Sequence, residues 1–432
     1  MVIRTQKKSK LCYGLPQGSP LSPILFNLYT NEILKEISKD CKMRAFADDI
    51  MYYKQHDNID TLENELNITT KKIYKMCLSF NIYMSPSKCK VLLVTKRKIN
   101  KTPKIKLGKS YLEVVNKYKY LGFTIDNRLK CDSHIKNSIK KAKNRMNIIR
   151  FISNKIKGAK IIHIINMYKA FVRPILEYGF TILLTMTKSR IKKLESCQHL
   201  CLTKLLHINK RSSSISLLST INMLTIENRL IILSVEFIKK SLEYNLNKLS
   251  MLKITRPENN IKKKFYSKSC IEQKLSHIYN QYIKTNKTKK QIKKSLLIKS
   301  FNDLKSKTEL NKNTEFFVHC FGYMLNKNLF SFKKYCKLKN SSVHFYIKIM
   351  TGSLKLNYFL YKLKVVPSDK CLVCNCIETS IHKLFYCSKH YMSRKKHTNF
   401  KKIKNKIQII TFITDINKIT KLQEAVTGIE KN

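Results

Sequence analysis

Two adjacent aspartates, Asp48 and Asp49, follow a short apolar segment near the start of the chain. Carboxylate oxygens are the hard ligands that Mg²⁺ prefers, so this pair could hold a divalent cation for phosphoryl transfer. Successive strand residues point to opposite faces, and adjacent aspartates can serve one metal site only at a turn. Residues 43–53 fit two short strands that turn at the pair. An ordinary solvated turn is the alternative, which Asp-Asp alone favours.

A second group of residues has the spacing of a metal site. Cys371, Cys374, His382 and Cys387 form the pattern C-x2-C-x7-H-x4-C, which is typical of a zinc knuckle with tetrahedral Zn²⁺. Two thiolates from a tight turn and a His/Cys pair on a short helix can converge on one ion. Cys376 is a fifth donor that could replace a ligand, and unmetallated core residues are the alternative.

A glycine- and proline-rich loop precedes the aspartates. Residues 14–23 read GLPQGSPLSP and hold two of the nine glycines and three of the eight prolines in the chain. Such a composition predicts a rigid, tightly turned backbone. Ser22 and Pro23 fit the N-cap and first position of a following helix. That helix would present apolar residues at helical spacing: Ile24, Leu25, Leu28, Tyr29, Ile33, Leu34 and Ile37.

Together these motifs resemble those of a known family. GLPQGSPLSPILFNLY followed by FADD is similar to the reverse transcriptases of non-LTR (LINE-type) retrotransposons, and of jockey-like elements in particular. The resemblance implies that Asp48 is the principal ligand and Asp49 the supporting ligand of a two-Mg²⁺ polymerase site. It further implies that the QG loop lines the nucleotide and template side, through Gln17, Gly18, Ser19 and Pro20.

Later segments also match the family. Lys88, in Ser85-Pro86-Ser87-Lys88, matches a lysine placed to protonate the leaving pyrophosphate, although an uninvolved surface lysine is the alternative. Tyr120, Leu121 and Gly122 match a turn that holds the primer end. Arg173-Pro174-Ile175-Leu176-Glu177-Tyr178-Gly179 matches a segment common after the palm, and Thr351-Gly352-Ser353-Leu354 and the cysteine motif match the carboxy-terminal CCHC block.

The implied fold is α+β, with a partial polymerase palm, a mainly helical thumb-like region and a small zinc-knuckle segment. The corresponding divisions are residues 1–130 for the palm and 131–250 for the thumb-like helices. A lysine-rich helical or connector region at 251–344, a knuckle segment at 345–400 and a basic tail at 401–432 follow. Helical periodicity is weak in the lysine-rich region, so we expect only short helices there. We also expect Pro174 to end a helix and Val91–Val94 to form a buried strand.

The family pattern requires a third carboxylate, on a strand several dozen residues before the QG loop. Only thirteen residues precede Gly14, and none is acidic. We therefore expect an amino-terminally truncated enzyme that lacks the fingers, the first catalytic aspartate and the family's endonuclease. The aspartate hairpin should then have an unpaired edge, and the isolated chain should not extend a primer. A separate polypeptide that completes the palm is possible.

Charge and composition indicate a polyanionic partner. The 432 residues carry 86 Lys+Arg against 27 Asp+Glu, a net charge of +59, which favours salt-sensitive binding to nucleic acid phosphates. The implied partners are an RNA template, a DNA primer or target, and dNTPs. Codon bias of an AT-rich genome could explain the excess of Lys over Arg, but it does not explain so few acidic residues.

The remaining inferences concern compartment and rival functions. No stretch approaches the roughly 18 uncharged apolar residues that span a bilayer, and most of the 14 cysteines are scattered as reduced thiols would be. We expect an intracellular protein without a membrane partner, in the nucleus or the cytoplasm. A non-catalytic nucleic-acid-binding relic is the main rival function. An intron maturase is a weaker rival because it does not end in this knuckle.

Overall fold

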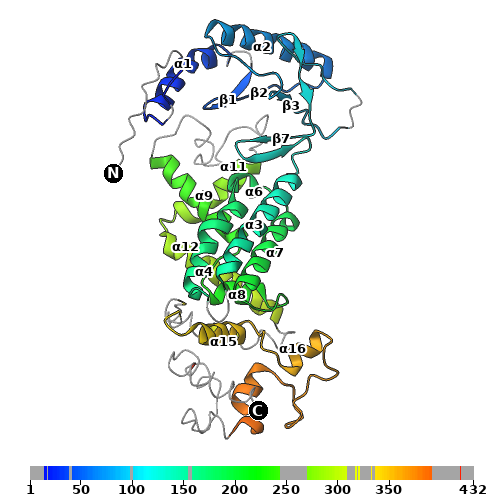
Figure 1. Cartoon of the computed structure of the whole chain (residues 1–432), viewed down its shortest axis with the longest axis vertical. Coiled ribbons are helices and arrows are strands. Elements are labelled where there is room, and N and C mark those ends of the chain that lie inside the picture. Colours follow the sequence, from blue (N-terminus) through cyan, green and yellow to red (C-terminus); the bar gives the residue numbers. More distant parts are fainter. Residues whose placement is uncertain are drawn as a thin grey trace, which may run out of the picture. The chain divides into compact units, whose positions relative to one another are not determined.

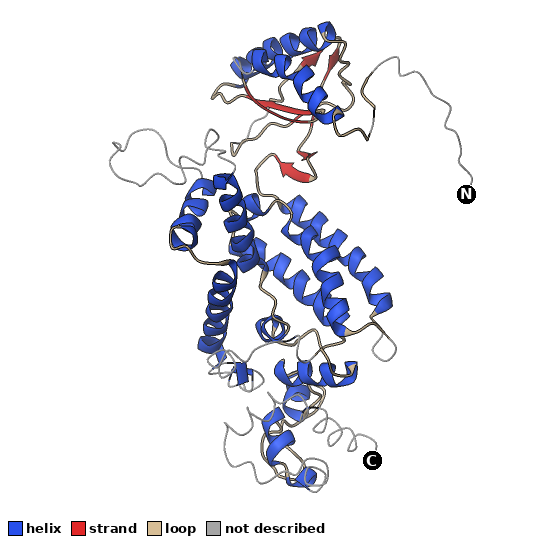
Figure 2. Ribbon diagram, turned by 90° about the vertical axis from the view of Figure 1, so that its left-hand side faces the viewer, coloured by secondary structure: helices blue, strands red, loops and turns tan. Residues whose placement is uncertain are grey.

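The computed structural model describes most of the chain, in two compact units that divide between His134 and Ile135. The described residues are 14–16, 18–37, 41–97, 101–153, 158–243, 270–308, 317–318, 320–321, 332, 336–391 and 419. The first unit combines helices with short strands, and the second is built from helices (Figure 2). This mixture agrees with the predicted α+β class.

Two helices pack on one face of a hairpin in the first unit. They are α1 (Ser22–Ile37) and α2 (Ile59–Ser79), and the hairpin consists of β1 (Lys42–Phe46) and β2 (Asp49–Tyr53). Figure 1 shows α1 and α2 beside β1 and β2. Their shared core contains Ile33 of α1 and Ile73 and Cys77 of α2, with Met43 and Tyr52 of the strands packed against it. Tyr52 fixes the arrangement, because its hydroxyl lies 2.9 Å from Thr70 Oγ1 of α2.

The predicted apolar face of α1 forms a helix, but its first two turns are exposed. Leu21, Ile24, Leu25 and Leu28 are between 47% and 65% exposed, whereas Ile33 is buried. Tyr29 contacts the end of α2, where its hydroxyl donates to the carbonyl of Phe80. Helical spacing therefore predicted the element correctly, while burial depends on what packs against it.

The two strands of the hairpin pair antiparallel around a two-residue turn. Their register pairs Phe46 with Asp49 and Lys42 with Tyr53, so Ala47 and Asp48 form the turn. Among the described residues β1 and β2 make a two-stranded sheet. This confirms the predicted strands.

The rest of the first unit is held by short strand pairs. Lys90–Val91 (β3) pairs in parallel with Glu113–Val114 (β6), and Lys106–Leu107 (β4) pairs with Ser110–Tyr111 (β5). The expected buried strand Val91–Val94 is wrong: β3 spans two residues and Val94 is 46% exposed. A continuous apolar run needs a partner strand along its whole length, and β6 is only two residues long. Lys117–Tyr120 (β7) and Phe123–Asp126 (β8) form another antiparallel hairpin.

The second unit has a helical core that joins residues far apart in the sequence. A large hydrophobic cluster joins buried residues between 135 and 419, including Ile135, Tyr168, Leu205, Tyr346 and Phe385. Its first helices are α3 (Asp132–Ile152), α4 (Ile161–Met167), η1 (Tyr168–Val172), α5 (Arg173–Glu177), α6 (Phe180–Leu183), α7 (Lys188–Leu205), α8 (Ser214–Thr220) and α9 (Ile226–Glu243).

Pro174 does not end a helix, contrary to the prediction. The chain passes from α4 through the π-helical turn η1 directly into α5, with Pro174 in the first turn of α5. A proline lacks the N–H that helical bonding requires, and a wider turn before it tolerates that loss. The helix ends at Glu177, and Gly179 follows with a φ of 75°.

The lysine-rich region contains a longer helix than predicted. After α11 (Cys270–Ile278) and η2 (Tyr279–Ile283), α12 spans Lys289–Thr308, 20 residues. Its apolar residues lie on two faces because they pack against two clusters: Ile292 and Leu296 belong to one, and Phe301 and Leu304 to the other. The sequence of α12 therefore lacks a single stripe of apolar residues at helical spacing, and for this reason periodicity underestimated the length of the helix.

The last described elements carry the cysteine motif. They are α15 (Asn340–Met350), α16 (Asn357–Lys362), η3 (His382–Tyr386) and the short 3₁₀ turn η4 (Ser388–His390). Gly352, with a φ of 62°, follows α15, and Ser353 N–H bonds to the Lys348 carbonyl, which is a helix-ending motif. Among the described helices, none has the length and hydropathy to cross a bilayer.

Candidate functional site

The loop before α1 is shaped by its glycines and by hydrogen bonds. Gly14 and Gly18 have φ values of 84° and 90°, which side-chain-bearing residues rarely adopt. Ser22 Oγ donates to the Pro16 carbonyl at 2.6 Å, and Ser22 N–H bonds to the Ser19 carbonyl. Of the predicted nucleotide-side residues, Gly18 and Pro20 are exposed and Ser19 is half-buried. Gln17 lies outside the described residues.

Both predicted catalytic carboxylates lie at the tip of the first hairpin. Asp48 is in the turn and Asp49 is the first residue of β2, and both are exposed. Ala47, the other turn residue, has a φ of 50°. A non-glycine residue in this region costs about 1–3 kcal/mol, and such strain is commonest at functional sites. The turn therefore brings adjacent carboxylates to one end of the sheet.

The hairpin of β7 and β8 contacts the aspartate pair. Tyr120, at the end of β7, donates its hydroxyl hydrogen to the Asp49 main-chain carbonyl over 3.4 Å. Burial raises the pKa of Tyr120, and the nearby Asp49 charge raises it further. Leu121 and Gly122 form the tip, both with positive φ, as a tight hairpin turn requires. Two segments 71 residues apart are thus joined at Asp49.

The predicted Lys88 lies in an exposed turn. Its N–H bonds to the Ser85 carbonyl at 3.2 Å, and Ser85 Oγ lies 3.0 Å from Ser87 Oγ. These contacts fix the backbone of the Ser-Pro-Ser-Lys segment and leave the Lys88 side chain exposed.

Asp126, a further acidic residue of the same unit, has a structural role. Its Oδ1 accepts from the N–H groups of Arg128 and Lys130, and its Oδ2 accepts from Cys131 N–H at 2.6 Å. A carboxylate that accepts three backbone bonds closes the turn after β8 and does not supply the third metal ligand of the family pattern.

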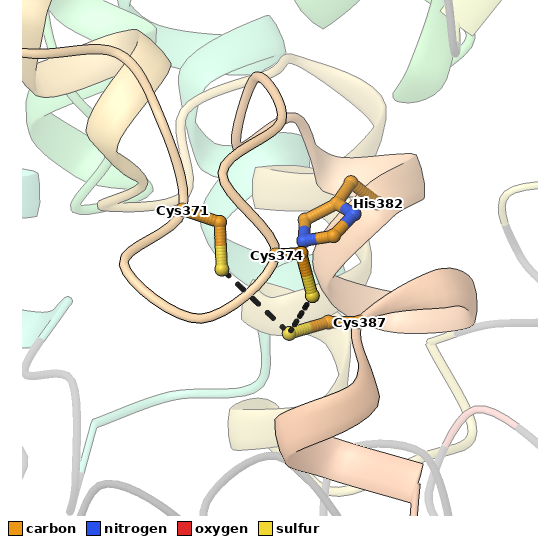
Figure 3. A group of neighbouring side chains, drawn as sticks. All are labelled: Cys371, Cys374, His382 and Cys387. Atoms are coloured by element: carbon orange, nitrogen blue, oxygen red, sulfur yellow. Dashed lines mark hydrogen bonds between the residues drawn. The ribbon is translucent and has the colours of Figure 1, made fainter.

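The four predicted zinc ligands converge near the other end of the chain. The donor atoms of Cys371, Cys374, His382 and Cys387 all lie within 4.8 Å of one another (Figure 3). Cys387 Sγ is 3.8 Å from the Sγ of both Cys371 and Cys374, too far for a disulfide. Cys371, His382 and Cys387 are buried. The sequence spacing therefore predicted this cluster completely.

Local bonds hold the cluster together. Cys371 N–H donates to the Cys376 carbonyl, and Cys387 N–H donates to the His382 carbonyl, both at 2.8 Å. The hydrogen bond with Ser388 lowers the pKa of the Cys374 thiol, whereas burial raises the pKa of Cys387 to about 11.

Two polar residues that sequence reasoning missed anchor the knuckle to α16. Glu378 Oε2 accepts from Asn357 N–H at 2.7 Å, and Asn357 Nδ2 donates to the Lys370 carbonyl at 2.8 Å. The sequence offers no signal for these hydrogen bonds, because Asn357 and Glu378 are 21 positions apart and neither belongs to the metal motif.

Cys376 contacts the imidazole of His382 and lies outside the cluster of mutually close donors. Its Sγ is 3.1 Å from His382 Nδ1 and 3.7 Å from Nε2. Figure 3 shows one ring nitrogen of His382 facing the cysteine sulfurs. With Nδ1 in contact with Cys376, Nε2 is the nitrogen available to a metal.

Comparison with known proteins supports the resemblance. Residues 2–125 match the family described as reverse transcriptase (RNA-dependent DNA polymerase). This match contains the QG loop, the aspartate hairpin and the Tyr-Leu-Gly turn. Together with the relatives described next, this match confirms the predicted likeness to jockey-like reverse transcriptases. No solved structure matches the chain.

Among characterised relatives, the chain is 25% identical over 195 residues to "RNA-directed DNA polymerase from mobile element jockey" of Drosophila melanogaster, covering 43% of this chain and 21% of the relative. It is 24% identical over 193 residues to "Probable RNA-directed DNA polymerase from transposon BS" of the same species, with 43% and 21% covered. The R2 retrotransposable-element Pol polyprotein of Popillia japonica is 30% identical over 139 residues, with 28% and 22% covered. The matched region thus spans about a fifth of each relative.

Proposed function

We propose that this chain belongs to the polymerase of a non-LTR retrotransposon, which copies RNA into DNA by adding dNTPs to a primer 3′-hydroxyl. In this proposal the first unit supplies the palm, the helices after His134 serve as a thumb, and the cysteine motif is a zinc knuckle. One observation carries it: the Tyr120 hydroxyl meets the Asp49 carbonyl. The segment assigned to the primer end therefore adjoins the segment assigned to the metals, within a region of reverse transcriptase homology.

Each residue then has a defined task. Asp48 and Asp49 offer exposed hard oxygens of the kind that Mg²⁺ prefers, although they supply only two of the family's three carboxylates. Bound Mg²⁺ would activate the 3′-hydroxyl and stabilise charge on the leaving pyrophosphate. The tight turn at Leu121 and Gly122 would position the primer end, and Gly18 would let the backbone approach the nucleotide. Lys88 would give a proton to pyrophosphate.

The knuckle geometry fits zinc. A tetrahedron with Zn–S bonds of about 2.3 Å has sulfur–sulfur edges of about 3.8 Å, the separation of Cys387 from Cys371 and Cys374. Zinc would fix the Cys371–Cys387 segment, and the basic surface around it would bind template RNA or target DNA.

Mapping of the primer end tests the polymerase proposal without requiring turnover. A primer with a photoreactive 3′-terminal base, annealed to an RNA template, should crosslink to residues 120–122 when Mg²⁺ is present. Asp48→Ala should weaken this crosslink, while Asp57→Ala, an exposed acidic residue beyond the hairpin, should not. Crosslinks spread over the lysine-rich surface and insensitive to both substitutions would instead favour a non-catalytic nucleic-acid-binding relic.

Primer extension provides the second test. Asp48 and Asp49 supply two of the family's three carboxylates, so the 432-residue polypeptide should incorporate dNTPs only when a third carboxylate is provided. Fusion to the first palm strand and fingers of a jockey-type relative should give incorporation, and Asp48→Ala in the fusion should abolish it. Template-directed incorporation by the unfused chain, lost in Asp48→Ala, would contradict the predicted inactivity.

A further inference from the structure

Two arginines contact one carboxylate in the second unit, and the charges of two lysines lie close to those arginines. These residues are Lys169 of η1, Arg173 of α5, Arg229 of α9 and Lys293 of α12, and the carboxylate is Glu177. Arg173 and Glu177 belong to the Arg-Pro-Ile-Leu-Glu-Tyr-Gly segment, whereas Lys293 comes from the lysine-rich region. The cluster therefore joins parts of the chain that the sequence does not connect.

Glu177 is already engaged by the two arginines. Its Oε1 lies 3.2 Å from the Nε atoms of Arg173 and Arg229, and Arg229 Nε also reaches Oε2 at 3.3 Å. The Glu177 side chain is 8% exposed, and those of Arg173 and Arg229 are 21% and 19% exposed. The Arg173 Nε contact lacks hydrogen-bond geometry, which leaves that buried N–H without an acceptor.

Lys293 adds a partly buried positive charge to the same place. Its Nζ donates to the neutral Asn222 carbonyl at 3.2 Å. Burial lowers the pKa of Lys293, and the charges of Lys169, Arg173 and Arg229 lower it further. The nearest further acid, Glu236 of α9, pairs with the exposed Lys289. Cationic side chains thus outnumber carboxylates at the cluster.

A structural ion pair explains only part of this arrangement. It accounts for two arginines around a buried carboxylate, but adding Lys293 to them is unfavourable because like charges repel and desolvation disfavours the ammonium. A buried donor without an acceptor also costs about 1–3 kcal/mol. A bound anion would remove both penalties. Arginine and lysine donors together match a tetrahedral oxyanion with several acceptor oxygens.

We propose that Arg173, Arg229 and Lys293, supported by Lys169, bind a phosphate group. The arginine side chains are about one-fifth exposed, so one phosphate, free or in a nucleic acid backbone, can reach them. The site lies outside the polymerase motifs, so its test does not depend on polymerase activity.

Thermal unfolding of the full chain tests the site. The protein, freed of nucleic acid, is compared in sodium phosphate and in sodium chloride at equal ionic strength. Phosphate should raise the Tm above the chloride value, and Lys293→Gln should raise the half-saturating phosphate concentration about tenfold, as expected for one charge-assisted hydrogen bond. Lys290→Gln is the matched control, since it removes the same charge from an exposed position of the same helix. Without phosphate, Lys293→Gln should be at least as stable as the original chain.

A second arm uses a short single-stranded oligonucleotide in chloride. An increase in Tm with inorganic phosphate that is lost in Lys293→Gln and kept in Lys290→Gln supports a site for free phosphate. An increase in Tm with the oligonucleotide but not with inorganic phosphate, again lost only in Lys293→Gln, supports binding of a nucleic acid backbone phosphate. The proposal is overturned if Tm is equal in phosphate and chloride and the oligonucleotide does not change it. It is also overturned if Lys293→Gln and Lys290→Gln lose the same part of the Tm increase.

Discussion

Removal of zinc should release the knuckle while leaving the helical core of the second unit folded. Three of the four ligands are buried, and the segment contributes only Leu384 and Phe385, with partly buried Ile381, to the large core. At a free zinc concentration 100 times Kd, bound metal contributes about 2.7 kcal/mol to the state that binds it. Chelation should therefore increase local opening about 100-fold.

Amide hydrogen exchange measures this opening directly. Cys371 N–H and Cys387 N–H are bonded within the knuckle, so their exchange should accelerate about 100-fold after chelation. Amides of α7, which holds no ligand, provide the internal control and should keep their rates. Cys387→Ser should exchange like the chelated protein whether or not zinc is added.

Two results would refute this reasoning. Knuckle amides that exchange at the same rate with and without chelator would show that packing alone holds the segment. Purified protein without zinc by elemental analysis, and without uptake of added Zn²⁺, would show that the thiols are ordinary core residues.

Three further predictions concern single positions. Cys376→Ser should keep stoichiometric zinc, measured by elemental analysis, because Cys376 lies beside His382 and outside the ligand cluster; loss of zinc would make it a ligand. Gly122→Ala should lower the free energy of unfolding by about 1 kcal/mol in urea, since φ is 81° there; an unchanged value would contradict the turn. In phosphate-free buffer, the free energy of unfolding of the original chain should rise relative to that of Lys293→Gln as the pH increases toward about 10, the usual pKa of lysine. The reason is that the folded protein releases the Lys293 proton at lower pH than the unfolded chain does. If the difference in free energy of unfolding between the two proteins, measured in urea, stays constant with pH, the burial of this charge is refuted.

The sequence predicted those features that depend on neighbouring residues. Glycine and proline placement predicted the loop at 14–23, alternating and apolar residues predicted the aspartate hairpin, and the knuckle spacing brought four ligand atoms together. The helix α1 also followed its apolar spacing. Each of these features is local, because the residues that form a turn, a helix face or a four-ligand motif lie within a few dozen positions of one another.

Tertiary structure decided what these elements contact. The bond from Tyr120 to Asp49, the exposed face of α1 and the anchoring of the knuckle by Asn357 and Glu378 depend on residues distant in sequence. The length of α12 escaped periodicity because its two halves pack against different clusters. Likewise, no local pattern relates Lys293 to Arg173. Periodicity and motif spacing specify backbone geometry, whereas burial and charge pairing arise only when separate segments meet.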